Sequence, residues 1–183
     1  MSGPADILDA AEAVADVLAQ FNIDAVVIGA VAMAAHHYVR HTEDLDLGVV
    51  ATEREMRQLA DELARHGFEA EFRSPGFDDP LAGVIDVRGD FGLVQIISYA
   101  GRFPVVIEEA LRGSVIAARE GSRLRIVPLP HLVALKLYAG GAKSRSDIAE
   151  LLDCNPDADR EAIRALCSRY RLSGVDEVFP GPR

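Results

Sequence analysis

The chain reads AVVIGAVAMAAHHYVRHTEDLDLGVV from Ala25 to Val50, and this segment gives the first indication of its fold. Its opening run, Ala25–Val31, is short, apolar and rich in β-branched residues, and Gly29 closes it, which predicts a buried strand. Small residues and histidines over Ala32–Tyr38 predict a short helix packed on that strand. Leu45–Val50 is expected to form a second strand, so the segment predicts the order strand, helix, strand.

Helices and further strands are expected on both sides of this segment. Pro4 favours the start of an amphipathic helix that ends near Asn22. Later in the chain, Thr52 and Glu55 have the spacing of a capping box that opens another helix. Strands are expected at residues 68–72, 83–87, 92–98, 115–118 and 124–127, and helices at 103–111, 130–139, 146–152 and 156–170. We therefore expect an α+β fold in two layers, with a mixed β-sheet core and flanking helices over residues 1–128 and a helical C-terminal cap over 129–183, or both parts in a single domain.

The charge of the chain argues against a general nucleic-acid binder. The 183 residues include 19 Lys and Arg against 29 Asp and Glu, a formal charge of −10, and phosphate neutralisation supplies nearly all non-specific affinity for nucleic acids. The charge is uneven, because seven basic residues between Arg112 and Arg145 are accompanied by one acid, Glu120. This basic window is either a solvated surface or a local wall that could hold a triphosphate or one RNA end.

Membrane and secretory signals are not expected in this sequence. The longest stretch without Asp, Glu, Lys or Arg near the N-terminus, Ala25–Val39, is shorter than the ~20 apolar residues of a bilayer span. The first residues lack a basic region before an apolar core, so no signal peptide is expected. Two cysteines, Cys154 and Cys167, exclude a disulfide framework, and a cytoplasmic location is the default expectation.

Two carboxylates at the start of the second expected strand could carry chemistry. Alternate residues of a strand share a face, so Asp44 and Asp46 project together, roughly 7 Å apart at Cα, while Leu45 and Leu47 enter the core. Such carboxylates repel each other unless a cation lies between them. Oxygen ligands at this spacing suit Mg²⁺, or Mn²⁺ in its place, with substrate phosphates completing the shell. The alternative is a pair of solvated acids at a strand end.

A glycine turn upstream favours the chemical interpretation. Gly29 and Ala30 lie about fifteen residues before Asp44. Their small side chains leave backbone N–H groups open to an anion. Phosphates are then expected between this turn and a metal ion on Asp44 and Asp46, which indicates phosphoryl or nucleotidyl transfer.

These residues resemble the signature of nucleotidyltransferases of the DNA-polymerase-beta superfamily. The similar segments are Gly29-Ala30-x-Ala32 and Arg40-x-Thr42-x-Asp44-x-Asp46-Leu47. The similarity is greatest to a small bacterial branch that contains the abortive-infection nucleotidyltransferase-like toxins of type IV toxin–antitoxin systems. It continues through residues 127–137 and then Lys143, Arg145, Asp147 and Leu151-Leu152, so it spans most of the chain.

The resemblance implies a role for each matching residue. Asp44 and Asp46 would bind Mg²⁺, and Gly29 and Ala30 would lie against the phosphates of a nucleoside triphosphate. Lys136 would pair with the triphosphate as a catalytic residue. Asp147 and Arg145 would support Lys136 in substrate binding. Arg40 and Thr42, also substrate-binding candidates, would brace the loop, and Arg40 could reach a phosphate. The implied acceptor is an RNA 3′ end or a protein hydroxyl, pyrophosphate is released, and an antitoxin protein is the implied partner.

The sequence departs from the family pattern where a third carboxylate is expected. The matching strand reads Val94-Gln95-Ile96-Ile97, and a Gln side chain is neither a base nor an anionic ligand. Asp86, on the preceding strand, is a candidate substitute. Ala30 replaces the usual second glycine or serine, and Ser146 replaces a frequent lysine. Two alternatives to an enzyme follow: a catalytically silent nucleotide-binding or regulatory module, and an interaction protein whose acidic half docks a basic partner.

The histidines close to the aspartates allow a different metal. Imidazole and carboxylate ligands together suit Zn²⁺ or Mn²⁺, and His36, His37 and His41 precede Asp44 and Asp46. We favour packing and loop hydrogen bonding for these three histidines.

Overall fold

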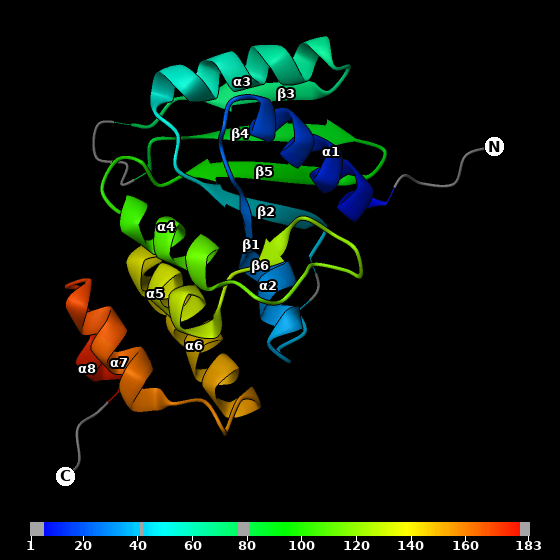
Figure 1. Ribbon diagram of the computed structural model, residues 1–183. Coiled ribbons are helices and arrows are strands. Elements are labelled where there is room, and N and C mark those ends of the chain that lie inside the picture. Colours follow the sequence, from blue (N-terminus) through cyan, green and yellow to red (C-terminus); the bar gives the residue numbers. More distant parts are fainter. Residues whose placement is uncertain (1–5, 41, 77–80, 180–183) are drawn as a thin grey trace.

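The computed structural model describes residues 6–40, 42–76 and 81–179. Its centre is a six-stranded mixed sheet of order β3-β4-β5-β2-β1-β6 (Figure 1). The strands are β1 Val26–Ile28, β2 Asp44–Val49, β3 Glu69–Arg73, β4 Gly83–Gly89, β5 Gly92–Ser98 and β6 Arg125–Ile126. The helices are α1 Ile7–Gln20, α2 Gly29–Ala35, α3 Glu53–Arg65, α4 Pro104–Gly113, α5 Leu129–Ala139, α6 Gly141–Cys154, α7 Arg160–Arg169 and α8 Val175–Val178. The expected α+β fold is confirmed.

Helices α1 and α3 cover one face of the sheet, as Figure 1 shows. Leu45, Leu47 and Val49 of β2 are fully buried beneath them, whereas Asp44 and Asp46 alternate with these residues and project from the opposite face. The start of α3 is the expected capping box. The Thr52 side chain accepts from the Glu55 backbone N–H, and the Glu55 side chain accepts from the Thr52 backbone N–H.

The helical C-terminal part packs on the other face near β1. Helix α4 contacts β1, and α5 contacts α2, α4, α6 and α7. The approach of α4 is close, because a Cβ on Gly48 of β2 would lie 2.7 Å from Ile107 Cδ1. Glu109 of α4 accepts hydrogen bonds from Arg169 and Tyr170, which lower its pKa to about 2. The division of the chain at residues 128 and 129 stays a prediction.

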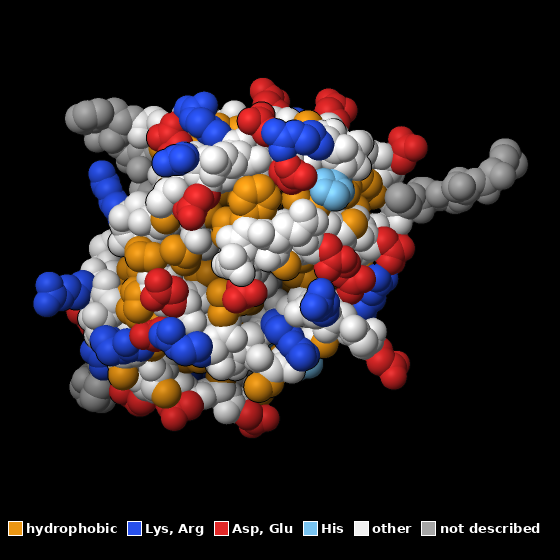
Figure 2. Space-filling view, turned by 45° about the horizontal axis from the view of Figure 1, so that its top comes forward, with side chains coloured by type: hydrophobic (Ala, Val, Ile, Leu, Met, Phe, Trp, Pro, Cys, Tyr) orange, Lys and Arg blue, Asp and Glu red, His pale blue; other side chains and the backbone are white. Residues whose placement is uncertain are grey.

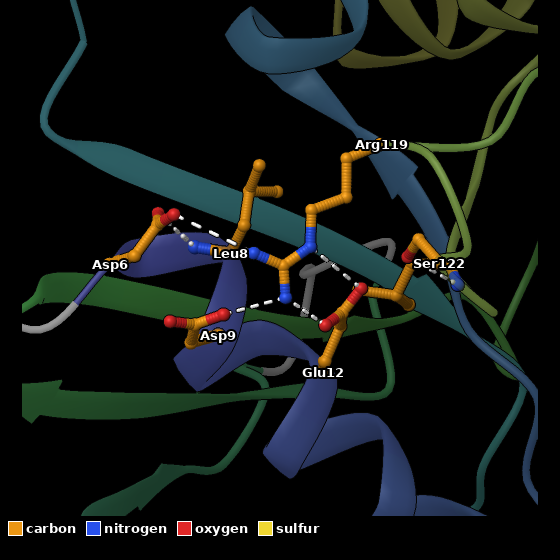
Figure 3. Close-up of polar contacts among 7 residues, drawn as sticks. Asp6, Leu8, Asp9, Glu12, Arg119 and Ser122 are labelled. Atoms are coloured by element: carbon orange, nitrogen blue, oxygen red, sulfur yellow. Dashed lines mark hydrogen bonds and ion pairs between the residues drawn. The ribbon is translucent and has the colours of Figure 1, made fainter.

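A connecting segment, residues 114–124, binds α1 instead of forming the strand expected at 115–118. It makes one isolated bridge, Ala117 to Arg125. Its Arg119 side chain pairs with Asp6, Asp9 and Glu12 at the start of α1 (Figure 3). Arg123 pairs in turn with Asp16, at 3.3 Å. The basic window is therefore not one continuous wall, since two of its arginines are neutralised by acids of α1.

The described residues include no helix long and apolar enough to span a membrane. On the face drawn in Figure 2, Lys and Arg side chains lie interspersed with Asp and Glu side chains. That face therefore carries charges of both signs.

Candidate functional site

Asp44 and Asp46 lie on a central strand between β1 and β5. Strand β2 pairs antiparallel with β1 and parallel with β5. Burial raises the pKa of Asp46 to about 6, and the neighbouring Asp44 charge adds to this effect. The charges of Lys136 and Arg40 act in the opposite direction. Three charged side chains, from β2, α5 and the loop after α2, therefore influence one carboxyl group.

Gly29 lies directly against Asp46. The residue has a φ of +67°, and a Cβ at this position would lie 1.9 Å from Asp46 Oδ2. Only glycine satisfies both the backbone conformation and this close approach. Ala30 is 5% exposed and its methyl group belongs to the core, so backbone atoms form most of the turn beside Asp46. The turn at Gly29 was expected to lie beside the aspartates, and in the structure Gly29 contacts Asp46.

Lys136 and Arg40 meet at a buried carboxylate. Lys136 Nζ lies 2.7 Å from Asp147 Oδ2, and Arg40 Nη1 lies 3.9 Å from the same oxygen. The Asp147 side chain is 5% exposed, which makes it the anchor of the two cations. Arg40 Nε is buried and has no hydrogen-bond acceptor among the described residues. The N–H group at Arg40 Nε therefore makes no hydrogen bond within the described residues.

Thr42 braces the approach to β2, and Arg145 lies elsewhere. The Thr42 hydroxyl accepts from the Asp44 backbone N–H at 3.2 Å and lies 3.3 Å from the Asp44 carbonyl oxygen. Arg145 is exposed on α6 and lines a separate cavity of about 210 Å³ between α5, α6 and α8, which Lys136 also borders. The predicted substrate-binding role of Arg145 therefore depends on this cavity and not on contact with Asp147.

The third carboxylate position is occupied by an amide. Gln95 of β5 pairs directly with Asp46 of β2 on one side and with Asp86 of β4 on the other. Its Nε2 donates to Asp86 Oδ1 at 2.7 Å. Asp86 shares the face of Asp46, one strand beyond Gln95.

Tyr99 was not anticipated among the residues around the site, whereas His36 makes hydrogen bonds of the kind favoured from the sequence. Tyr99 follows β5, is 8% exposed, and has a pKa raised by burial and by the Asp46 charge. No motif marks this tyrosine; its place directly after the strand of Gln95 was the available signal. His36 Nε2 donates to the Val127 carbonyl at 2.7 Å, and Asn155 donates to the His36 carbonyl, which ties α2 to the C-terminal helices.

The donor set fits a hard divalent cation held by two carboxylates. No group of three or more His, Cys, Asp and Glu side chains among residues 6–40, 42–76 and 81–179 is arranged to hold a metal. The described residues therefore offer no histidine-containing cluster for Zn²⁺ or Mn²⁺. His41, one of the three histidines considered, lies outside the described residues. A cavity of about 400 Å³ is bordered by Val31, Asp44 and Phe91, and neither Asp46 nor Lys136 lines it.

The mixed sheet, the glycine turn and the paired aspartates together define a nucleotidyltransferase-like fold. No protein-family model matches the sequence, and no curated protein matches it. The structure is similar to the antibiotic-resistance factor ANT(2'')-Ia in solution, with a TM-score of 0.53 and 16% identity over 91% of this chain and 93% of that chain. It is also similar to an antigenic nucleotidyltransferase-like protein from Paracoccidioides brasiliensis, with a TM-score of 0.53 and 18% identity over 88% of this chain and 85% of that chain.

A crystal structure of ANT(2'')-Ia with adenylyl-2''-tobramycin gives a TM-score of 0.51 at 16% identity, over 86% of this chain and 92% of that chain. At these identities the likeness establishes the fold. The chain therefore has the nucleotidyltransferase fold that the resemblance implied, whereas the toxin branch stays a prediction.

Proposed function

We propose that this protein is a metal-dependent nucleotidyltransferase. It binds a nucleoside triphosphate with Mg²⁺, or with Mn²⁺, and transfers the nucleotidyl group to a hydroxyl acceptor. The observation that carries the proposal is the contact of the Gly29 turn with Asp46, beside the cations Lys136 and Arg40. A metal-binding carboxylate, an open backbone turn and two cations are the parts that a triphosphate requires.

Each part has a task in nucleotide binding. Asp44 and Asp46 would hold the divalent cation, which when bound neutralises the leaving group and aligns the acceptor. The turn at Gly29 and Ala30 lies against the phosphates. Lys136 pairs with the triphosphate, and Arg40, whose side chain is partly exposed, can donate from its guanidinium to a phosphate oxygen. Asp147 keeps both cations in place and Thr42 fixes the start of the aspartate strand.

The transfer is a single displacement at the α-phosphorus. The acceptor hydroxyl oxygen forms a bond to this phosphorus, the bond from phosphorus to the bridging oxygen of the β-phosphate breaks, and pyrophosphate leaves. The hydroxyl proton is released to water. Atoms and charges therefore balance without an oxidant or a further substrate.

The acceptor and the partner are proposed from the resemblance. An RNA 3′ end or a protein hydroxyl is the proposed acceptor, and an antitoxin protein is the proposed partner. The ANT(2'')-Ia complex contains adenylyl-2''-tobramycin, so a screen of acceptors also needs small hydroxylated molecules. Cys154 and Cys167 are free thiols, which agrees with the cytoplasmic location that we propose.

A catalytically silent nucleotide-binding module is the second candidate function. The neutral Gln95 favours it, since this amide occupies the strand position next to Asp46 where the family pattern has a carboxylate. Such a module would bind nucleotide and Mg²⁺ through the same residues but would transfer nothing.

Binding and transfer experiments separate these functions. Calorimetry with ATP, CTP, GTP and UTP, with and without Mg²⁺, is expected to show Mg²⁺-dependent binding of at least one nucleotide. Incubation with α-labelled nucleotides and total RNA, protein extract or small hydroxylated molecules then detects transfer. Asp44→Asn and Asp46→Asn are expected to abolish labelling, while Asp61→Asn, at an exposed position of α3, preserves it.

Absence of Mg²⁺-dependent binding for all four nucleotides would reject the nucleotide site altogether. Binding without transfer to any acceptor would support the silent module. Full labelling by Asp46→Asn would show that the metal assignment is wrong.

A further inference from the structure

Gln95 separates two carboxylates that lie in one row across the sheet. Asp46, Gln95 and Asp86 occupy directly paired positions on β2, β5 and β4. Directly paired residues point to the same face of a sheet. The row therefore reads carboxylate, amide, carboxylate on the face that carries Asp44, and the amide is the immediate neighbour of Asp46.

The carboxylate of Asp86 accepts hydrogen bonds from three donors. Its Oδ1 accepts from Arg73 Nη2 at 2.9 Å and from Gln95 Nε2 at 2.7 Å, and its Oδ2 accepts from Arg88 Nη2 at 2.9 Å. The residue is 4% exposed. Burial alone would raise the pKa of Asp86, but these hydrogen bonds and the arginine charges lower it. Asp86 is thus an ionised group that the protein itself has neutralised.

Asp86 also lies too far away to substitute for a carboxylate at position 95. With strands about 4.8 Å apart, its Cα is about 10 Å from that of Asp46, against about 5 Å for residue 95. Mg²⁺ binds oxygen ligands at about 2.0–2.1 Å, and two-metal sites place their ions about 3.5–4 Å apart, so bridging carboxylates must be close neighbours. The Gln95 amide directs its nitrogen, which carries only donors, toward Asp86.

We infer that the site holds one divalent cation per bound nucleotide, ligated by Asp44 and Asp46, and that the cluster of Arg73, Asp86, Arg88 and Gln95 excludes a second cation. This inference rests on the proposed nucleotidyltransferase function. Gln95 is a positioning residue in this arrangement: it keeps an uncharged group next to Asp46 and links the outer carboxylate to its arginines. Among residues 6–40, 42–76 and 81–179, no free carboxylate faces the acceptor hydroxyl on the β5 side of Asp46.

Counting bound metal tests the inference without measuring activity. The full chain is dialysed to equilibrium against Mn²⁺ and an α,β-methylene analogue of the nucleotide that calorimetry selects, and bound metal and nucleotide are determined per chain. Wild type is expected to bind one Mn²⁺ and one analogue. Gln95→Asp is expected to bind two Mn²⁺, while Gln58→Asp, the same change at an exposed position of α3, binds one.

Gln95→Ala provides a second variant in case Gln95→Asp does not fold. It is expected to bind one Mn²⁺ with an affinity within threefold of wild type, because the inference assigns both protein ligands of the cation to Asp44 and Asp46 and none to the amide. Two Mn²⁺ per wild-type chain, one per folded Gln95→Asp chain, or a tenfold loss of affinity in Gln95→Ala would each overturn the inference and leave the proposed function intact. Binding of neither Mn²⁺ nor analogue by wild type would instead overturn the proposed function, and the inference with it.

Discussion

Asp46→Asn is expected to stabilise the protein at neutral pH while it abolishes metal binding. The pKa of Asp46 rises from 3.8 to about 6, first because the group is buried and then because Asp44 lies beside it. The folded state therefore binds more protons than the unfolded state between these two values. Stability falls as the pH rises through this window, because the ionised carboxylate is less well solvated in the fold than in the open chain.

The size of the effect follows from the shift. One pKa unit corresponds to about 1.36 kcal/mol, so a rise from 3.8 to about 6 corresponds to a penalty of about 3 kcal/mol. The penalty is absent below the unfolded value and complete above pH 6. Asn has nearly the shape of Asp and keeps the contact with Gly29, but it carries no charge. The free energy of unfolding of Asp46→Asn is therefore expected to exceed that of wild type by up to about 3 kcal/mol above pH 6. Near pH 4 the two values are expected to differ little.

Urea unfolding at five values from pH 4 to pH 8, without divalent metal, measures this difference. Groups with lowered pKa, such as Glu109 at about 2, affect both proteins alike and cancel. Asp61→Asn controls for loss of an exposed acid and is expected to show a difference that does not change between pH 5 and pH 8. A stability difference for Asp46→Asn that is negative at pH 8, or that is equal at all five values, would refute the reasoning.

Two further substitutions test the contacts around Asp46. Gly29→Ala is expected to lose binding of Mn²⁺ and nucleotide in equilibrium dialysis, because its Cβ would displace Asp46. Gly67→Ala is the control, since Gly67 has a φ of +89° and open space around the position of the Cβ. It is expected to share the backbone strain of about 1 kcal/mol and to keep binding. Lys136→Met is expected to lower the free energy of unfolding by about 3 kcal/mol, because it leaves the buried Asp147 without its nearest cation, and adding Asp147→Asn is expected to recover most of the loss. A loss below about 1 kcal/mol in urea unfolding would show that the pair behaves as an exposed one.

The parts of the fold that local pattern determines were predictable. A run of β-branched residues closed by Gly29 gave β1, and alternation of polar and apolar residues placed Asp44 and Asp46 on one face. The Thr52 capping box fixed the start of α3. Each of these signals involves residues within a few positions of one another, where backbone sterics and burial act directly.

The pairing of distant residues was not predictable from periodicity. Seven basic residues in one window left two interpretations open, a solvated surface or a local wall. Arg119 and Arg123 instead bind acids of α1 more than one hundred residues away in the sequence. The contact of Gln95 with Asp86 follows from the order of the strands, which places β5 between β2 and β4. Tyr99 lies near Asp46 for the same reason, because it follows that central strand.

The neutral Gln95 and the raised pKa of Asp46 belong to one electrostatic balance. A carboxylate at position 95 would lie about 5 Å from Asp46, and two such charges repel by about 3 kcal/mol at an effective dielectric constant of 20. This is as large as the penalty that Asp46 already imposes on the fold. A site with three carboxylates therefore depends on a second cation for its own stability, whereas Gln95 removes both the repulsion and the ligand. The single cation that we infer for this site thus follows from the same charge distribution that makes the stability of the metal-free protein sensitive to pH.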